Sequence, residues 1–296
     1  MLISVVIPTF QRPEALARCL ECIGRQKLAQ ENFEVIVTDD SGDAESKTLV
    51  HEKFPRAQWT QGPQRGPAAN RNYGASLARG EWIVFVDDDC EPAFGWLEAI
   101  AVQADVDVIE GKTVCPSDRD TPFEERVENL KGESFWSCNL AVRRSVFNRL
   151  GGFDEDFLEA GGEDMEFAWR IAKNKLHTRF VAGALVIHPA RVLIWKQIWW
   201  RTWLMRWIVL FRVKTGQSPS LRASWFESLW WLVRVEILNL LRVTLHFFLK
   251  FDSKRWRTQA FQVGWKWLTF PLVLPYLMVW EIRFRNSLGN RAASIK

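Results

Sequence analysis

Within the first 90 residues, three short apolar segments each run directly into a polar loop. We predict strands over residues 2–8, 33–38 and 82–86, because these runs are short and rich in β-branched or aromatic residues. Helical periodicity over residues 14–26 and 71–79 places helices between the strands. Strands that alternate with helices indicate an α/β sheet with parallel strands.

The loops that follow these strands are rich in acids. Because such sheets bind ligands outside the carboxyl ends of their strands, we expect Thr9, Asp39, Asp40 and the aspartates at 87–89 along one rim. Three adjacent carboxylates repel one another unless a cation is present, and hard oxygen ligands suit Mg²⁺ or Mn²⁺. Mg²⁺ is typically held by carboxylates together with substrate phosphates, which points to a nucleotide-linked substrate. The alternative is a solvated turn that uses Asp for capping and chain reversal.

The net charge of +4 is the sum of two opposite parts. Residues 1–189 contain 21 Lys/Arg against 31 Asp/Glu, a balance of −10, whereas residues 190–296 contain 18 against 4, a balance of +14. Of the 17 tryptophans, 12 lie after His188. We therefore predict a catalytic domain over 1–189 and a basic, mostly helical region over 190–296. A basic segment rich in Trp suggests an anionic membrane surface as its partner.

Four motifs lie at or near the ends of the predicted strands. They are SVVIPTF at 4–10, VIVTDDSG at 35–42, ANRNYG at 69–74 and FVDDD at 85–89. In this order they resemble a family 2 glycosyltransferase, which implies a GT-A nucleotide-sugar-binding sheet flanked by helices. The resemblance assigns the donor nucleotide to Pro8, Thr9, Asp40, Arg71, Asp87 and Asp88. It assigns a divalent cation, Mg²⁺ or Mn²⁺, to Asp89 and Asp87.

A second group of motifs extends the resemblance to about residue 188. NLAVRR at 139–144, GGFDE at 151–155 and GGED at 161–164 resemble the acceptor-side block of the family. The resemblance implies that Asp164 is the catalytic base, that Glu163 lies at the acceptor and that His188 is a further metal ligand. The alternatives are first-turn acids that complement a helix dipole and a hydrogen-bonded loop histidine.

Trp136 and Asn139 are further acceptor-site candidates. Trp faces commonly stack on sugars, and an Asn side chain offers both a donor and an acceptor. Core packing is an alternative explanation for Trp136.

Two segments of the basic part have helical periodicity, residues 191–213 and 226–250. The first carries a stripe of Trp195, Trp199, Trp203 and Trp207, and the second is apolar around most of its circumference. Such helices must be covered by lipid or protein. A helical layer packed on the catalytic domain is one alternative to a membrane surface. Nucleic-acid binding is disfavoured because the charges are embedded in apolar helices.

No segment offers the roughly 20 apolar residues that a spanning helix needs. The nearest is the uncharged run over 267–280, where Pro271 and Pro275 favour a broken, re-entrant or interfacial segment. Five cysteines without a signal-peptide pattern favour a reducing compartment. We therefore expect a cytoplasmic protein that is peripherally associated with the cytoplasmic face of a membrane.

Together these features predict a metal-dependent, inverting glycosyltransferase that moves a sugar from a nucleotide-sugar donor to an acceptor hydroxyl. The expected acceptor is a lipid-linked saccharide or glycolipid. A sugar-nucleotide-forming nucleotidyltransferase also uses carboxylate-bound Mg²⁺, but it needs a Gly-rich basic phosphate loop near the first strand. Residues 11–13, QRP, are a poor substitute for that loop. A non-catalytic membrane adaptor that retains the fold is the alternative from a different functional class.

Overall fold

The computed structural model describes residues 2–117, 119, 121–218, 225–249 and 256–294. The chain divides into two compact units. The first is Met1–Ser117 with Arg126–Ala190, and the second is Asp118–Glu125 with Arg191–Lys296.

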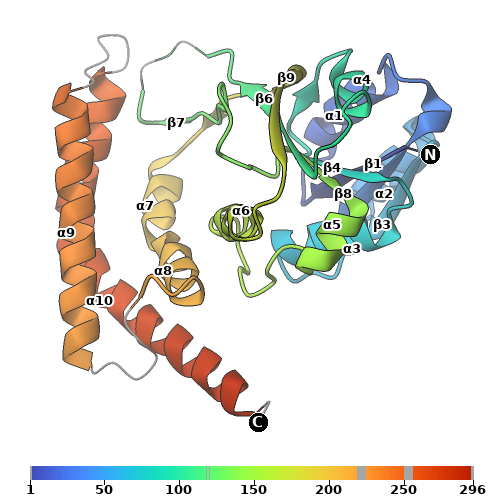
Figure 1. Ribbon diagram of the computed structural model, residues 1–296. Helices are drawn as coiled ribbons and strands as arrows, with labels where there is room; N and C mark the ends of the chain where they lie inside the picture. Colours follow the sequence, from blue (N-terminus) through green and yellow to red (C-terminus); the bar gives the residue numbers. More distant parts are fainter. Residues whose placement is uncertain (1, 118, 120, 219–224, 250–255, 295–296) are drawn as a thin grey trace. The chain divides into compact units, whose positions relative to one another are not determined.

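The first unit contains an eight-stranded sheet of order β3-β2-β1-β4-β8-β6-β9-β5 (Figure 1). Its parallel part consists of β1 (Ile3–Thr9), β2 (Phe33–Asp39), β3 (Ala57–Gln61) and β4 (Trp82–Val86). The other strands are β5 (Glu91–Pro92), β6 (Val108–Val114), β8 (Asn139–Arg143) and β9 (Thr178–Ile187). β8 is antiparallel to both β4 and β6, β9 is parallel to β6, and β5 is antiparallel to β9.

The sheet is therefore mixed, and its parallel part contains the strands that the sequence predicts. The three strands predicted from apolar runs are present as β1, β2 and β4, and β1 pairs in parallel with both of the others. The antiparallel strand β8 enters between β4 and β6 after the long connection that follows β6. No local pattern in the sequence reveals the direction of a strand that arrives in this way.

Helices cover both faces of this sheet. One core contains residues of α1 (Pro13–Gly24), α2 (Glu45–Lys53) and α4 (Trp96–Ala101), and the other contains residues of α3 (Pro67–Leu77), α5 (Arg144–Leu150) and α6 (Glu163–Lys173). In β1, Val5 and Ile7 face the first core and Val6 faces the second. Strands buried on both faces appear in the sequence as continuous apolar runs, which is why they were visible there.

The described residues of the second unit form a short antiparallel pair and four helices. The pair is β7 (Glu124–Glu125) with β10 (Arg191–Val192), and the helices are α7 (Trp195–Trp203), α8 (Met205–Lys214), α9 (Trp225–Leu249) and α10 (Trp256–Ser294). Residues of α8, α9 and α10 form a small core of Val209, Val213, Leu232, Val273 and Leu277.

The predicted helix over 191–213 is instead two helices, because α7 ends before Leu204 and α8 begins after it. The predicted stripe of tryptophans does not continue across this break. Trp195 is 56% exposed, whereas Trp207 is 3% exposed. The second predicted helix corresponds to α9.

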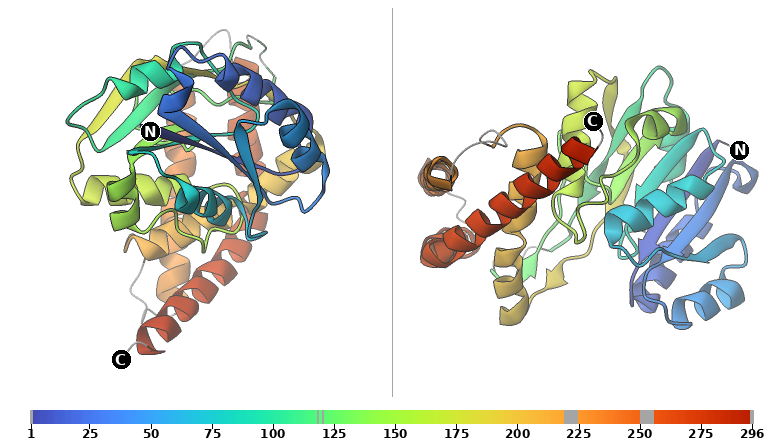
Figure 2. Two further views of the ribbon diagram at one scale, coloured as in Figure 1. Left: turned by 90° about the vertical axis from the view of Figure 1, so that its right-hand side faces the viewer. Right: turned by 90° about the horizontal axis from the view of Figure 1, so that it is seen from below.

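The prolines of the uncharged run lie inside α10, so the broken form of this segment is not found, and its re-entrant or interfacial placement stays a prediction. The helix continues through Pro271 and Pro275 and bends along its length (Figures 1 and 2). A proline removes one backbone hydrogen bond and kinks a helix. Val273 and Leu277, which are buried in the helical core, hold the segment in place. Among the described residues, no helix combines the length and apolar character needed to cross a bilayer.

Candidate active site

The carboxyl ends of β1, β2 and β4 bring the predicted donor-site residues together. Thr9 ends β1, directly after the half-buried Pro8, and its backbone carbonyl accepts a hydrogen bond from the backbone N–H of Asp40 at 3.1 Å. The Thr9 hydroxyl donates to Asp88 Oδ2 at 2.7 Å. Three loops that are distant in sequence are thus joined by direct contacts at one rim of the sheet.

Burial raises the pKa of Asp88 to about 6, and the nearby Arg12 and the Thr9 hydroxyl only partly oppose this effect. Arg12 donates to Asp88 Oδ1 and to Asp89 Oδ2, each at 3.1 Å. It precedes α1, within the QRP segment at residues 11–13. Arg12 is therefore a cationic group at the donor rim that the sequence motifs did not assign.

Asp40 lies in a tight polar corner. Its Oδ1 accepts a hydrogen bond from the backbone N–H of Gln64 at 2.9 Å, and burial raises the pKa of its carboxyl. A Cβ added to Gly62 would lie 2.2 Å from Asp40 Oδ1 and 2.3 Å from Asn70 Oδ1. A glycine at position 62 therefore leaves the space that the Asp40 carboxylate occupies.

Arg71 connects the donor rim with the acceptor-side motif. This side chain is buried in α3 and donates to Asp87 Oδ1 at 2.9 Å and to Glu163 Oε1 at 3.3 Å. Burial alone would lower the pKa of Arg71, but the charges of Asp87, Asp164 and Glu163 outweigh burial and raise it. Arg71 is thus a fixed cation that holds two acids separated by 76 residues in sequence.

Asp164 lies in the first turn of α6, and its two carboxylate oxygens have different environments. Oδ2 accepts hydrogen bonds from the backbone N–H of Ser137 at 3.2 Å and from the Ser137 hydroxyl at 3.3 Å. Oδ1 is buried and has no hydrogen-bond partner among the described residues. Burial and the charge of Glu163 raise the pKa of Asp164 to about 7, against the opposing effect of Arg71. A carboxylate with this pKa can accept a proton near neutral pH.

Glu163 is held more firmly than its neighbour. Besides Arg71, it accepts the backbone N–H of Gly161 on Oε2 at 2.8 Å, and it is buried. Gly161 and Gly162 have φ of 128° and 139°, a conformation that L-residues rarely adopt. The two glycines thus allow the sharp turn that leads into α6 and orients both acids.

Asp89, Cys90 and His188 form a group whose ligand atoms lie within 4.8 Å of one another. Nδ1 of His188 is 3.1 Å from the carbonyl oxygen of Pro189, which can only accept, so Nδ1 donates there and a neutral imidazole would offer Nε2 as a ligand. Nε2 lies 3.7 Å from Asp89 Oδ1. This carboxylate and imidazole pair fits a divalent cation.

Cys90 is less suited to such an ion. A hydrogen bond with Cys138, together with burial, raises the pKa of the Cys90 thiol well above its ordinary value. A protonated thiol is a poor ligand for a hard cation. The oxygen and nitrogen atoms of Asp89 and His188 are therefore the better candidates.

Asn139, a predicted acceptor-site residue, makes hydrogen bonds to other parts of the same domain. Its amide nitrogen donates to the carbonyl oxygens of Lys112 and Ala184, and its oxygen accepts from Trp96 Nε1 at 2.9 Å. Asn139 is also buried. Because its amide is occupied by contacts with β6 and β9, we leave it out of the proposed acceptor site. Trp136 is partly buried and packs against the first core.

Glu110 is a residue that the motifs did not single out. It is buried in β6 and accepts hydrogen bonds from the Asn129 amide and from the backbone N–H groups of Glu133, Ser134 and Phe135, at 2.7 to 3.1 Å. Glu133 and Phe135 have φ of 72° and 49°, so the loop that Glu110 holds contains strained backbone. This loop leads directly to Ser137 and so to Asp164.

Two protein-family models match the segments that carry these residues. Residues 4–109 match the model of glycosyl transferase family 2, and residues 122–189 match that of the N-terminal domain of galactosyltransferase. Residues 4–109 are a family 2 glycosyltransferase domain. Arg71 and the acids at 39–40 and 87–89 lie inside this domain. Glu163, Asp164 and His188 lie in the second matched segment.

Curated relatives of this chain are similar to it over part of their length. Validoxylamine A glucosyltransferase of Streptomyces hygroscopicus subsp. limoneus is 29% identical over 216 residues, which cover 57% of this chain and 48% of the relative. Chondroitin synthase of Escherichia coli is 27% identical over 239 residues, covering 63% of this chain and 34% of the relative. The chain thus spans about half the length of the first relative and a third of the second.

Two solved structures share the fold. TarS of S. aureus in complex with UDP is 19% identical, with a TM-score of 0.55 over 89% of this chain and 92% of that chain. The mannosyltransferase PcManGT from Pyrobaculum calidifontis, in complex with GDP-Man and Mn²⁺, is 18% identical, with a TM-score of 0.56 over 90% of this chain and 86% of that chain. The fold is thus that of the GT-A glycosyltransferases, as the motifs predicted.

Proposed function

We propose that this chain transfers a sugar from a nucleoside diphosphate sugar to an acceptor hydroxyl, with inversion at the anomeric carbon. The observation that carries the proposal is the position of Asp164. Its Oδ1 has no hydrogen-bond partner among the described residues, and its neighbour Glu163 is joined through Arg71 to Asp87 at the donor rim. A proton acceptor is thereby held next to the residues proposed for the donor.

In the proposed reaction, the acceptor oxygen attacks the anomeric carbon and its proton passes to Asp164 Oδ1. The bond between the anomeric carbon and the phosphate oxygen breaks, and its electron pair leaves with the diphosphate. Attack from the face opposite the leaving group inverts the anomeric configuration. General-base assistance of this kind contributes about 100- to 10,000-fold to a rate.

The donor side has separate roles. Asp40 would bind the nucleoside, and Arg71 and Asp87 would orient the diphosphate end of the donor. Asp89 and His188, with Asp87, would hold a divalent cation, which supplies positive charge against the negative charge that develops on the leaving diphosphate.

The same proposal places the enzyme at an anionic membrane surface. The second unit carries the excess of basic residues, and several of its tryptophans are exposed, including Trp195, Trp200 and Trp230 at 51% to 58%. Trp favours the bilayer interface, and long basic side chains reach lipid headgroups. A cytoplasmic membrane face and a lipid-linked saccharide or glycolipid acceptor follow from this placement.

A donor panel tests the proposed activity. The full chain is incubated with UDP- and GDP-sugars and Mn²⁺, and release of the nucleoside diphosphate is measured. We expect release from one donor class, its loss with EDTA and its loss in Asp89→Ala. Release of pyrophosphate from a nucleoside triphosphate and a sugar phosphate would instead identify a nucleotidyltransferase, and no turnover of any donor would favour a non-catalytic adaptor.

Vesicle flotation tests the proposed location. The full chain is mixed with vesicles of phosphatidylcholine alone or with 30 mol% of an anionic phospholipid, about the fraction that gives a strongly charged surface. We expect flotation with the anionic vesicles that weakens at high salt. Failure to float with either vesicle would refute the membrane placement and leave the donor assay unaffected.

A further inference from the structure

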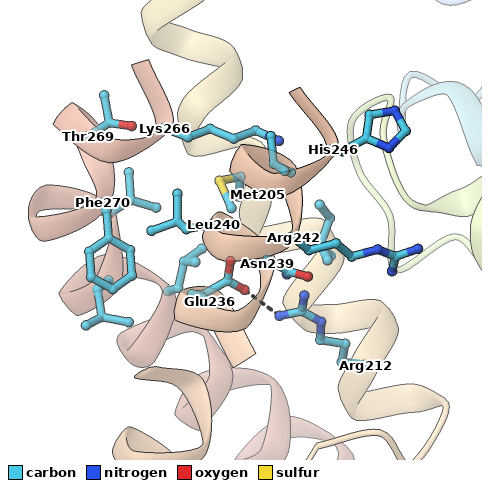
Figure 3. Close-up of a pocket in the computed structure, with 15 residues that line it drawn as sticks. Met205, Arg212, Glu236, Asn239, Leu240, Arg242, His246, Lys266, Thr269 and Phe270 are labelled. Carbon is cyan, nitrogen blue, oxygen red and sulfur yellow. Dashed lines mark hydrogen bonds and ion pairs between the residues drawn. The ribbon is translucent and has the colours of Figure 1, made fainter. Parts of the chain in front are cut away.

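The helices of the second unit form a partly open cavity of about 370 Å³. It lies among α8, α9 and α10, and Figure 3 shows the side chains that line it. Its volume is within the range of small-molecule sites, roughly 300–1,000 Å³. Eight of its fifteen lining residues are apolar, and they include Leu240, Phe270 and Val273. The cavity therefore offers a mainly apolar interior.

The charged residues around this cavity do not balance. Among the described residues that line it, Glu236 is the only acid, and it is paired with Arg212 at 2.5 Å (Figure 3). Arg242 and Lys266 also line the cavity, and no carboxylate of the described residues pairs with either. Both side chains are exposed, and Lys266 extends from α10 toward α9 (Figure 3). Two uncompensated cations thus lie at the border of an apolar space.

His246 adds a third nitrogen base to this border. It lies one turn beyond Arg242 on α9, and it is exposed. Arg242 and His246 from α9 and Lys266 from α10 therefore all line the same cavity.

We propose that this cavity binds a lipid with a phosphate headgroup, whose alkyl chain enters the apolar interior while its phosphate contacts Arg242 and Lys266. A phosphate monoester carries about 1.5 to 2 negative charges at pH 7, which matches the two unpaired cations. An apolar peptide would leave those cations unmatched, and a free phosphate would leave the apolar interior unfilled. The site lies wholly in the second unit and does not depend on the transfer chemistry proposed above.

Calorimetric titration of the full chain tests this site, with each amphiphile kept below its micelle concentration. The probes are octyl phosphate, decyl phosphate, decanol and inorganic phosphate. We expect saturable one-to-one binding of decyl phosphate, and at least about tenfold weaker binding of decanol and inorganic phosphate. Burial of each added methylene strengthens binding by up to about fourfold, so decyl phosphate should bind up to about 15-fold more tightly than octyl phosphate.

Two variants localise the binding, and a third controls for charge. Lys266→Glu should weaken decyl phosphate binding by at least about tenfold, whereas Arg283→Glu, an equal charge change on the same helix outside the cavity lining, should leave it unchanged. Leu240→Trp should block the cavity, with folding checked by circular dichroism. Equal weakening in Lys266→Glu and Arg283→Glu, or inorganic phosphate binding as tightly as decyl phosphate, would overturn the proposal.

The donor assay keeps this result separate from the proposed function. Decyl phosphate binding in a chain that turns over no donor would uphold the cavity site and refute the transferase proposal. Donor turnover in a chain that binds no decyl phosphate would uphold the transferase proposal and refute the cavity site.

Discussion

Ser137 donates two hydrogen bonds, one from its backbone N–H and one from its hydroxyl, to the same carboxylate oxygen of Asp164. This arrangement fixes the orientation of the Asp164 side chain and leaves Oδ1 without a partner among the described residues. A base needs both a fixed position and an available lone pair. The Ser137 contact fixes the carboxylate through Oδ2, and Oδ1 keeps a lone pair available for the proton. The same carboxyl has a pKa raised to about 7, so its titration should be visible in activity and in stability.

The first prediction concerns pH and rate. Because Asp164 must be ionised to act as a base, kcat/KM should rise with pH through a midpoint near 7 and then reach a plateau. The charge of Glu163 contributes to the raised pKa of Asp164, so Glu163→Gln should move this midpoint to lower pH. A midpoint that is unchanged in Glu163→Gln, or a rate independent of pH between 5 and 9, would contradict the assignment.

The second prediction concerns pH and stability. The pKa of Asp164 is higher in the folded chain than its ordinary value of 3.8, so the folded state binds more protons between those two pH values. The contribution of Asp164 to the free energy of unfolding therefore falls as pH rises from about 4 through about 7. Asp164→Asn removes the titrating carboxyl, so the variant does not lose this part of the free energy of unfolding as pH rises. Its melting temperature should exceed that of the wild-type chain by more at pH 8 than at pH 5, and a difference that is the same at both pH values would contradict the raised pKa.

The third prediction concerns the nucleoside corner. Gly62→Ala places a Cβ against the Asp40 carboxylate and the Asn70 side chain, so these flexible groups must move while the fold persists. We expect the affinity for the nucleoside diphosphate to fall by about tenfold or more, measured by calorimetry. Gly95→Ala is the matched control, because nothing lies within 4 Å of its added Cβ. Equal affinity in the two variants would exclude Asp40 from the nucleotide site.

The fourth prediction concerns Glu110 as a positioning residue. Glu110→Gln replaces a buried carboxylate that accepts four hydrogen bonds, so the free energy of unfolding should fall by about 2–4 kcal/mol in urea denaturation. Relaxation of the loop ahead of Ser137 should raise KM for the acceptor and leave KM for the donor unchanged. Glu98→Gln removes an exposed pair with Lys27 and should cost less than about 1 kcal/mol. A loss of stability without any change in acceptor KM would assign Glu110 to the fold alone.

The gathering of acids at one rim of the sheet could be predicted from sequence because its signals are local. Asp40 and Asp87 follow directly after apolar strands that are buried on both faces, and parallel strands bring their carboxyl ends to one edge. The resemblance to glycosyltransferases also pointed to Arg71 and Glu163. Their mutual contact, across 92 residues of sequence, appears only in the folded chain.

Other parts of the site have no local signal. Glu110 is a single acid in a strand, and its importance arises from a loop that folds back onto it more than 18 residues later. Asn139 lies in a motif of the predicted acceptor side, yet its amide is buried and donates to Lys112 and Ala184, contacts that no local pattern reveals. The continuity of α10 through Pro271 and Pro275 depends on tertiary packing, which overrides the local tendency of proline to end a helix.

The most direct test of the central claim is the transfer rate of Asp164→Asn, a change that preserves the size of the side chain and removes its charge. The rate should fall by at least about 100-fold, while the affinity for the nucleoside diphosphate stays within about twofold of wild type and the circular dichroism spectrum is unchanged. The exposed substitution Asp43→Asn should leave the rate unaltered. Transfer by Asp164→Asn at a rate within tenfold of the wild-type chain would show that Asp164 is not the base.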